Sequence, residues 1–92
     1  MRTIELPLPV KKATDALRER LHATVDAEPV GTANRYRLGV MSTQFSGMPH
    51  MRRQDLVWEI VDSVLDREES LMLTVILALS PEELSTSDPA AL

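Results

Sequence analysis

Two histidines are the first residues to consider for acid–base or metal chemistry, and their positions give it little support. His22 and His50 lie far apart in the chain, and no histidine–acid pair falls on an apolar helix face. The chain contains no cysteine, which excludes a thiolate nucleophile, a thiolate ligand and a disulfide. It also lacks a nucleophile elbow and a glycine-rich phosphate loop. We therefore expect no enzymatic activity, no metal site and no cofactor.

Four arginines could instead contact an anionic partner. They form two pairs, Arg35 with Arg37 and Arg52 with Arg53, and the second pair falls in the first turn of an expected helix. Arginines at such positions can contact phosphates. The net charge is −4, however, and the three aromatic residues are too few for a base-stacking platform. Nucleic-acid binding is therefore an alternative function, and contact with a protein partner is the main one.

The predicted partner-binding surface is the start of that helix and the loop before it. An aromatic residue next to an arginine is a typical interface anchor, and the free N–H groups of a helix N-terminus favour an acidic partner group. An alternative for the aromatic residue, Phe45, is that it closes the end of the core. If both arginines serve binding, replacing them with alanine leaves thermal stability nearly unchanged. The predicted surface consists of Phe45, Gly47, Met48, Pro49, Arg52 and Arg53.

Two amphipathic helices must position these residues within one small domain of 92 residues. The first is predicted from about residue 9 or 10 to residue 22, because apolar residues recur at helical spacing and Pro9 suits a first turn. The second is predicted from about residue 49 or 50 to residue 65. Gln54 falls in its apolar sector, where it needs a backbone partner unless it lies beyond the sheet edge. We expect an extended arm over residues 1–9, the domain over 10–84, and a flexible tail over 85–92.

Three strands are predicted over residues 24–28, 36–42 and 71–79. The third is apolar at every position but Thr74, which is typical of a central strand. Its two faces are distinguished by alternation. The expected core face carries Leu71, Leu73, Val75, Leu77 and Leu79, and the other face carries Met72, Thr74, Ile76 and Ala78. Residues 80–83 match a capping box with Pro81 at the first position of a short last helix.

The element order α-β-β-α-β-α predicts the fold class. A short loop makes the first two strands antiparallel, and the right-handed crossover through the second helix makes the second and third strands parallel. The result is an α+β sandwich in which helices cover one face of a three-stranded mixed sheet. The uncovered face could form a homodimer through Met41, Met72 and Ile76. The apolar run is too short to span a bilayer and no secretory signal is visible, so we expect a cytoplasmic protein without a membrane partner.

Two segments of the sequence resemble the BolA-like family. Residues 36–47 resemble its aromatic-led strand and Ser-x-x-Phe-x-Gly turn, here Ser42, Phe45 and Gly47. Residues 53–58 resemble the start of the helix that follows, and residues 79–83 resemble the entry into the last helix. With the element order, the resemblance covers about residues 10–84. It implies a KH-like α/β fold and, as a partner, a monothiol glutaredoxin.

The resemblance also implies where an iron–sulfur cluster would be bound in that family. The cluster is held with a histidine at the start of the last strand and a cysteine or histidine in the loop between the first two strands. In this chain Met72 falls at the first position, and residues 29–34 contain neither cysteine nor histidine. In the family's Arg-His-Arg motif, Arg53 is kept while Gln54 and Asp55 replace the other two residues. We therefore expect no cluster ligation by this route.

Overall fold

The computed structural model describes residues 6–31 and 34–86. Its elements follow the predicted order, with two short helices added that were not predicted, over residues 43–45 and 67–70. The expected arm over residues 1–9 is partly wrong, because Leu8 and Pro9 already belong to the first helix; residues 1–5 lie outside the described residues. Of the expected tail, Ser85 and Thr86 belong to the last helix, and residues 87–92 lie outside the described part. The elements are α1 (Leu8–Leu21), β1 (Thr24–Val30), β2 (Arg35–Met41), η1 (Thr43–Phe45), α2 (His50–Val64), α3 (Arg67–Ser70), β3 (Leu73–Leu79) and α4 (Pro81–Thr86).

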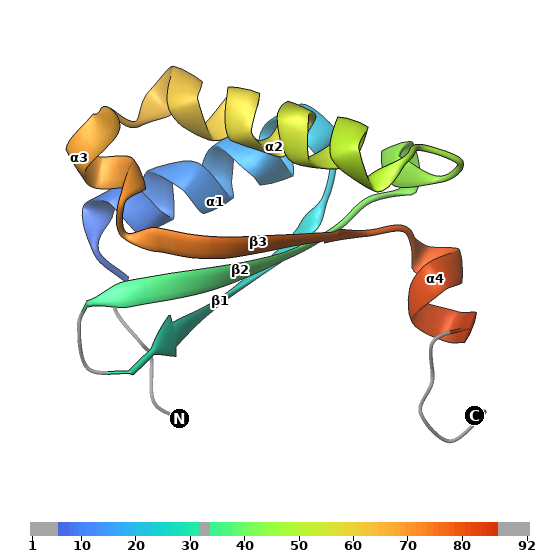
Figure 1. Cartoon of the computed structure of the whole chain (residues 1–92), viewed down its shortest axis with the longest axis horizontal. Helices are drawn as coiled ribbons and strands as arrows, with labels where there is room; N and C mark the ends of the chain where they lie inside the picture. The colour runs from blue at the N-terminus through green and yellow to red at the C-terminus, as the bar shows by residue number, and fades with distance from the viewer. Residues whose placement is uncertain (1–5, 32–33, 87–92) are drawn as a thin grey trace.

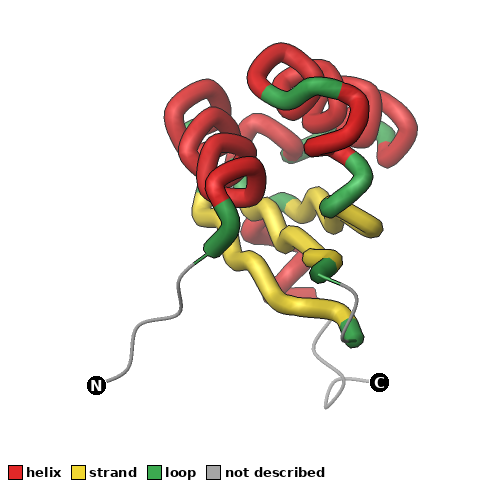
Figure 2. Tube along the Cα trace, turned by 90° about the vertical axis from the view of Figure 1, so that its left-hand side faces the viewer, coloured by secondary structure: helices red, strands yellow, loops and turns green. Residues whose placement is uncertain are grey.

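The three strands form one mixed sheet in the order β1-β2-β3. β1 pairs with β2 antiparallel, and β2 pairs with β3 parallel, as the right-handed crossover through α2 requires. Figures 1 and 2 show α1 and α2 side by side on one face of this sheet. The predicted α+β sandwich with helices on one face is therefore confirmed.

The core lies between these two helices and the sheet. From α1 it takes the four residues whose helical spacing predicted the buried stripe, Val10, Ala13, Leu17 and Leu21. From α2 it takes Val57, Ile60 and Val61, and from the sheet Val25, Leu38, Val40, Leu73, Ile76 and Ala78. None of the helices in the described part of the chain is long and apolar enough to cross a membrane.

The predicted orientation of β3 is right at Leu73 and wrong on both sides of it. Leu71, predicted as its first core residue, lies before the strand and is 62% exposed. Leu73 is buried as expected, but Val75 is 45% exposed and Leu77 is 50% exposed, while Ile76 is buried. The cause is a register irregularity: Tyr36 pairs with Leu73 and the next residue, Arg37, pairs with Val75. The extra residue, Thr74, reverses the alternation, because successive side chains of a strand point to opposite faces. The predicted dimer face is wrong for the same reason, since Ile76 points into the core.

Candidate functional site

The loop before α2 is held at both ends by hydrogen bonds. Ser42 donates from Oγ to the carbonyl oxygen of Leu21 at 2.8 Å and accepts from the N–H of Gln44 at 3.1 Å. The short helix η1 follows, and Gly47 turns the chain with a φ of 75°, a value that favours glycine. The N–H of Met48 then donates to the carbonyl of Phe45 at 2.9 Å. This loop therefore presents a fixed surface at the start of α2.

Phe45 lies inside this loop, and its predicted role as an exposed anchor is wrong. Its side chain is fully buried and belongs to the core. The alternative, that Phe45 closes the end of the core under the loop, agrees with the structure. An aromatic ring in a loop gains most by covering the open end of a helix–sheet core, which removes a large apolar area from water.

Arg53 is also buried, at 3% exposure, and holds three elements together. Its Nε donates to the carbonyl oxygen of Met48 at 2.7 Å and its Nη1 to that of Ala78 at 3.1 Å. Both Nη atoms donate to the carboxylate of Glu83 in α4, and the guanidinium lies 5.8 Å from the centre of the Phe45 ring. These contacts oppose the expectation that Arg53 can be removed without loss of stability, because its removal would leave the carbonyl groups of Met48 and Ala78 and the Glu83 carboxylate without this donor.

Glu83 has two roles at the start of α4. With Ser80 it forms the predicted capping box: the N–H of Ser80 donates to Glu83 at 2.9 Å, and the N–H of Glu83 donates to Ser80 Oγ at 3.4 Å. The hydrogen bonds from Arg53 and from the Ser80 backbone lower the pKa of Glu83 to about 2. Ser46 of the loop donates to Glu82 at 2.9 Å. Short as it is, α4 is thereby tied to α2 and to the loop.

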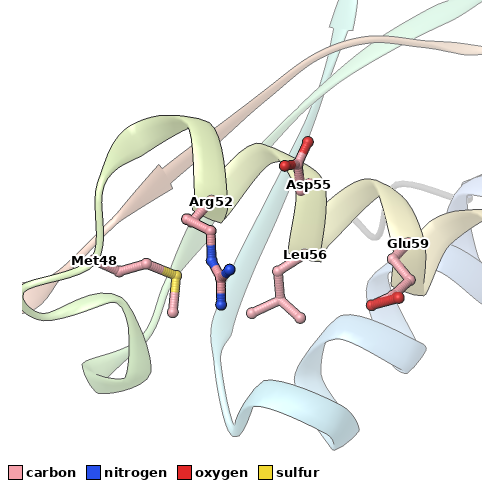
Figure 3. A pocket seen from close by; sticks show the side chains of 5 residues that line it. All are labelled: Met48, Arg52, Asp55, Leu56 and Glu59. Atoms are coloured by element: carbon pink, nitrogen blue, oxygen red, sulfur yellow. The ribbon is translucent and has the colours of Figure 1, made fainter.

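The remaining predicted residues lie at or near the surface, and two of them, Met48 and Arg52, line a shallow hollow of about 290 Å³. Met48 reaches it from the loop, while Arg52 and Leu56 project into it from successive turns of α2 (Figure 3). Gly47, Pro49 and Arg52 are exposed, and Met48 is half-buried. Sequence reasoning missed Leu56, although its position one turn after Arg52 was a usable signal. We call this set the Met48 surface: Met48, Arg52, Asp55, Leu56 and Glu59.

The Met48 surface combines apolar and charged side chains. Its centre is apolar, from Met48 and Leu56, and adaptable, because methionine is unbranched and flexible. Arg52 supplies a fork of donors that matches a carboxylate. Asp55 and Glu59 bring acidic groups to the rim. The arrangement therefore places an apolar contact area beside a hydrogen-bond donor that matches a carboxylate.

The positions considered for metal chemistry are not brought together. His22 ends α1 with a left-handed φ of 49°, and His50 is the first residue of α2. Met72, at the position of the family's cluster histidine, lies just before β3 and is half-buried. In the described ranges, 6–31 and 34–86, no three histidine or acidic side chains gather as metal ligands would. The inter-strand loop lies partly outside those ranges.

The four arginines considered for nucleic acid do not form one patch. Arg53 is buried in the contacts described above, and Arg37 pairs with Glu28 on the sheet. Arg35 begins β2, whereas Arg52 lies on α2. Phosphate contacts require cations that can be aligned along a backbone. The exposed members of the set are Arg35 and the ion-paired Arg37 on β2, and Arg52 alone on α2.

Comparison with known proteins adds to this description only at the level of solved structures. No protein-family model matches the sequence, and no curated protein matches it. BolA1 from Arabidopsis thaliana superimposes with a TM-score of 0.69 at 20% identity, over 84% of this chain and 96% of that one. The BolA domain of SufE1 from the same plant gives 0.68 at 19% identity, over 86% and 99%.

A third solved structure, a Bol-like protein from Babesia bovis, gives a TM-score of 0.62 at 17% identity, over 92% of this chain and 94% of that one. These three structures share the small mixed sheet with helices described above. The chain therefore has the BolA-like fold.

Proposed function

We propose that this chain is a non-enzymatic interaction module that binds a protein partner through the Met48 surface. The observation that supports this function is the pair of adjacent arginines. Arg53 is buried and fixes the loop to β3 and α4, while Arg52 is exposed beside Met48. A loop whose backbone is fixed before binding loses less conformational entropy when a partner docks.

The partner that suits this surface carries an acidic side chain next to an apolar one. The carboxylate would accept two parallel hydrogen bonds from Arg52, and the apolar side chain would cover Met48 and Leu56. Asp55 and Glu59 on the rim repel a partner that is acidic throughout. A monothiol glutaredoxin, the partner that the BolA resemblance implies, is the first protein to seek.

The experiment is an affinity capture from native lysate with three forms of the protein: wild type, Arg52→Glu and Arg20→Glu. Arg20 is an exposed residue of α1, so its reversal matches the change in net charge. We expect one partner to be recovered with wild type and Arg20→Glu and lost with Arg52→Glu. Amide chemical shifts in a titration with the recovered protein should then move at Met48 and Leu56. Full recovery with Arg52→Glu would contradict the proposed surface.

The same purified protein offers a test of the cofactor expectation. Because Met72 replaces the cluster histidine, we expect anaerobic reconstitution to yield a colourless protein, both alone and mixed with a monothiol glutaredoxin. Visible absorption and iron content are the readouts. Stoichiometric iron that depends on His22 or His50 would show a different ligand set and contradict this expectation.

A further inference from the structure

The face of the sheet opposite the helices carries an ordered set of side chains. α1 and α2 leave it uncovered, and α4 extends on this side only from the end of β3 (Figures 1 and 2). Two rows cross the strands in register: Asp26, Gly39 and Leu77 form one, and Thr24, Met41 and Leu79 form the next. We call the six residues of these two rows the open sheet face.

Gly39 creates a hollow in this face. A volume of about 150 Å³ opens above it, lined by residues of both rows, and a cavity of about this volume admits a benzene-sized group. Glycine weakens the interior of a strand, and there it often marks the close approach of another molecule. The backbone of Gly39 does not need glycine: its φ lies outside the left-handed region, and an added β carbon would meet nothing within 4 Å.

A carboxylate lies on the rim of the hollow. Asp26 is exposed and faces Gly39 across the β1–β2 pair. Within residues 6–31 and 34–86 it forms no salt bridge, whereas Glu28, two residues further along β1, pairs with Arg37. The hollow therefore combines an apolar floor with an acidic rim, and its complement is an apolar side chain next to a cation.

The edges of the sheet disfavour a partner that adds as a strand. On β1 the carbonyl of Val25 accepts from Arg18 at 3.0 Å. On β3 the carbonyl of Ile76 accepts from Gln54 at 2.8 Å, and that of Ala78 from Arg53 at 3.1 Å. Side chains thus occupy acceptors that a new strand would need. An occupant is better placed across the face, as α1 and α2 lie across the other one.

We propose that the open sheet face binds an amphipathic basic helix of a partner protein. One leucine or methionine of the helix enters the hollow above Gly39, and a lysine or arginine three or four positions away meets Asp26. The spacing fits, because neighbouring strands are about 4.8 Å apart and such helix positions lie roughly 5–6 Å apart. This proposal does not depend on the Met48 surface.

A second copy of this chain fits the face less well. A two-fold axis along β2 would lay Asp26 of one copy over Leu77 of the other. An axis across the strands, along the Gly39 row, would lay Asp26 over the same residue of the other copy. Both arrangements remove a carboxylate from water without giving it a cation.

The probe is a synthetic amphipathic peptide of leucine and lysine, about 18 residues long so that it forms a helix, with a leucine–glutamate peptide of the same pattern as control. Titration into the isotope-labelled protein should move amide shifts of the open sheet face. Gly39→Val adds apolar volume to the hollow from a β carbon that has open space around it, and it should weaken binding of the lysine peptide about tenfold or more, the effect of losing an anchor. Its thermal midpoint should not fall, which separates lost binding from lost folding.

Charge reversal at Asp26 is the second part of the experiment. Asp26→Lys should lower the affinity for the lysine peptide about threefold to tenfold and raise the affinity for the glutamate peptide. Asp62→Lys on the exposed side of α2 changes net charge equally and should have little effect. Equal effects of the two reversals, or Gly39→Val at wild-type affinity, would overturn the proposal. So would a dimer in sedimentation that Gly39→Val abolishes, because the face would then belong to a second copy.

Discussion

The two sides of the sheet are built from the same three strands and serve different ends. The side under α1 and α2 carries Leu38, Val40, Ile76 and Ala78, all buried. The other side carries Gly39 and Leu77 in neighbouring strands, which both line a hollow that α1 and α2 do not cover (Figure 2). Residues one position apart on β3 therefore belong to the core and to a surface. Apolar character alone therefore does not show that a strand residue lies in the core.

The same contrast is repeated at the start of α2. Arg53 lies on the inner side of the helix and holds the loop, β3 and α4 together, while the adjacent Arg52 is exposed. In both regions one side stabilises the fold, and the proposals above assign the other side to recognition. The predictions that follow test this division.

The largest effect is expected from Phe45→Ala. Phe45 is fully buried, so the substitution removes a ring and leaves a cavity, which costs about 3–5 kcal/mol of the free energy of unfolding. Met48→Ala, three residues later and half-buried at the Met48 surface, is the control and should cost about 1 kcal/mol or less. Chemical denaturation measures both. Equal costs would mean that the loop does not separate a core side from a surface side.

Arg53→Met should cost about 2–3 kcal/mol, since it removes charged hydrogen bonds to Met48, Ala78 and Glu83 while retaining the aliphatic stem. Arg52→Met should change stability by roughly 0.5 kcal/mol or less, as is usual at an exposed position. A larger loss of stability from Arg52→Met than from Arg53→Met would contradict the assignment of Arg53 to the fold and Arg52 to the surface.

Acid should weaken the inner side through Glu83. Its pKa is about 2 in the folded protein against a usual 4.5, mainly because Arg53 donates to it. A depressed pKa stabilises the fold above the unfolded value, and this contribution is lost as pH falls from about 4.5 towards 2. Urea midpoints measured across that window should fall for wild type and fall less for Glu83→Gln. Parallel curves for the two proteins would show that the ion pair does not form.

The smallest effect is expected from Gly39→Val. An added β carbon at position 39 would meet no atom within 4 Å, and valine is a good strand former. The free energy of unfolding should therefore stay equal or rise by up to about 1 kcal/mol. Thermal unfolding measures it. A clear loss of stability would mean that something already fills the hollow in the folded protein.

Local patterns predicted the elements well. Helical spacing identified the buried stripe of α1, turn residues separated β1 from β2, and Ser80 with Glu83 formed the expected capping box. Gln54, on the apolar side of α2, has the backbone partner that its position required, the carbonyl of Ile76. These features depend either on residues that are close together in the sequence or on a helix face that the spacing of apolar residues defines. One signal was overlooked: Asp66 and Glu69 form a second capping box, at the start of α3.

Long-range pairing accounts for the errors. The extra residue at Thr74 exists only in the register between β2 and β3, so alternation along β3 alone could not reveal that Val75 and Leu77 face outward. Arg53 looked like an exposed helix-start arginine because its partners, Ala78 and Glu83, lie far along the chain. The burial of Phe45 could not be predicted for a similar reason: the core residues around it come from segments outside the loop, so the loop sequence alone does not indicate them.

The most direct test of this division is to compare Ile76→Ala with Leu77→Ala, measuring both unfolding and binding of the leucine–lysine peptide. Ile76 is buried, and its loss should cost about 2–5 kcal/mol while leaving peptide affinity of the folded protein unchanged. Leu77 is half-exposed beside the hollow. Leu77→Ala should lower the free energy of unfolding by about 1 kcal/mol or less but clearly lower the affinity for the peptide. Two substitutions that lower stability equally, or that leave binding equally intact, would contradict the account.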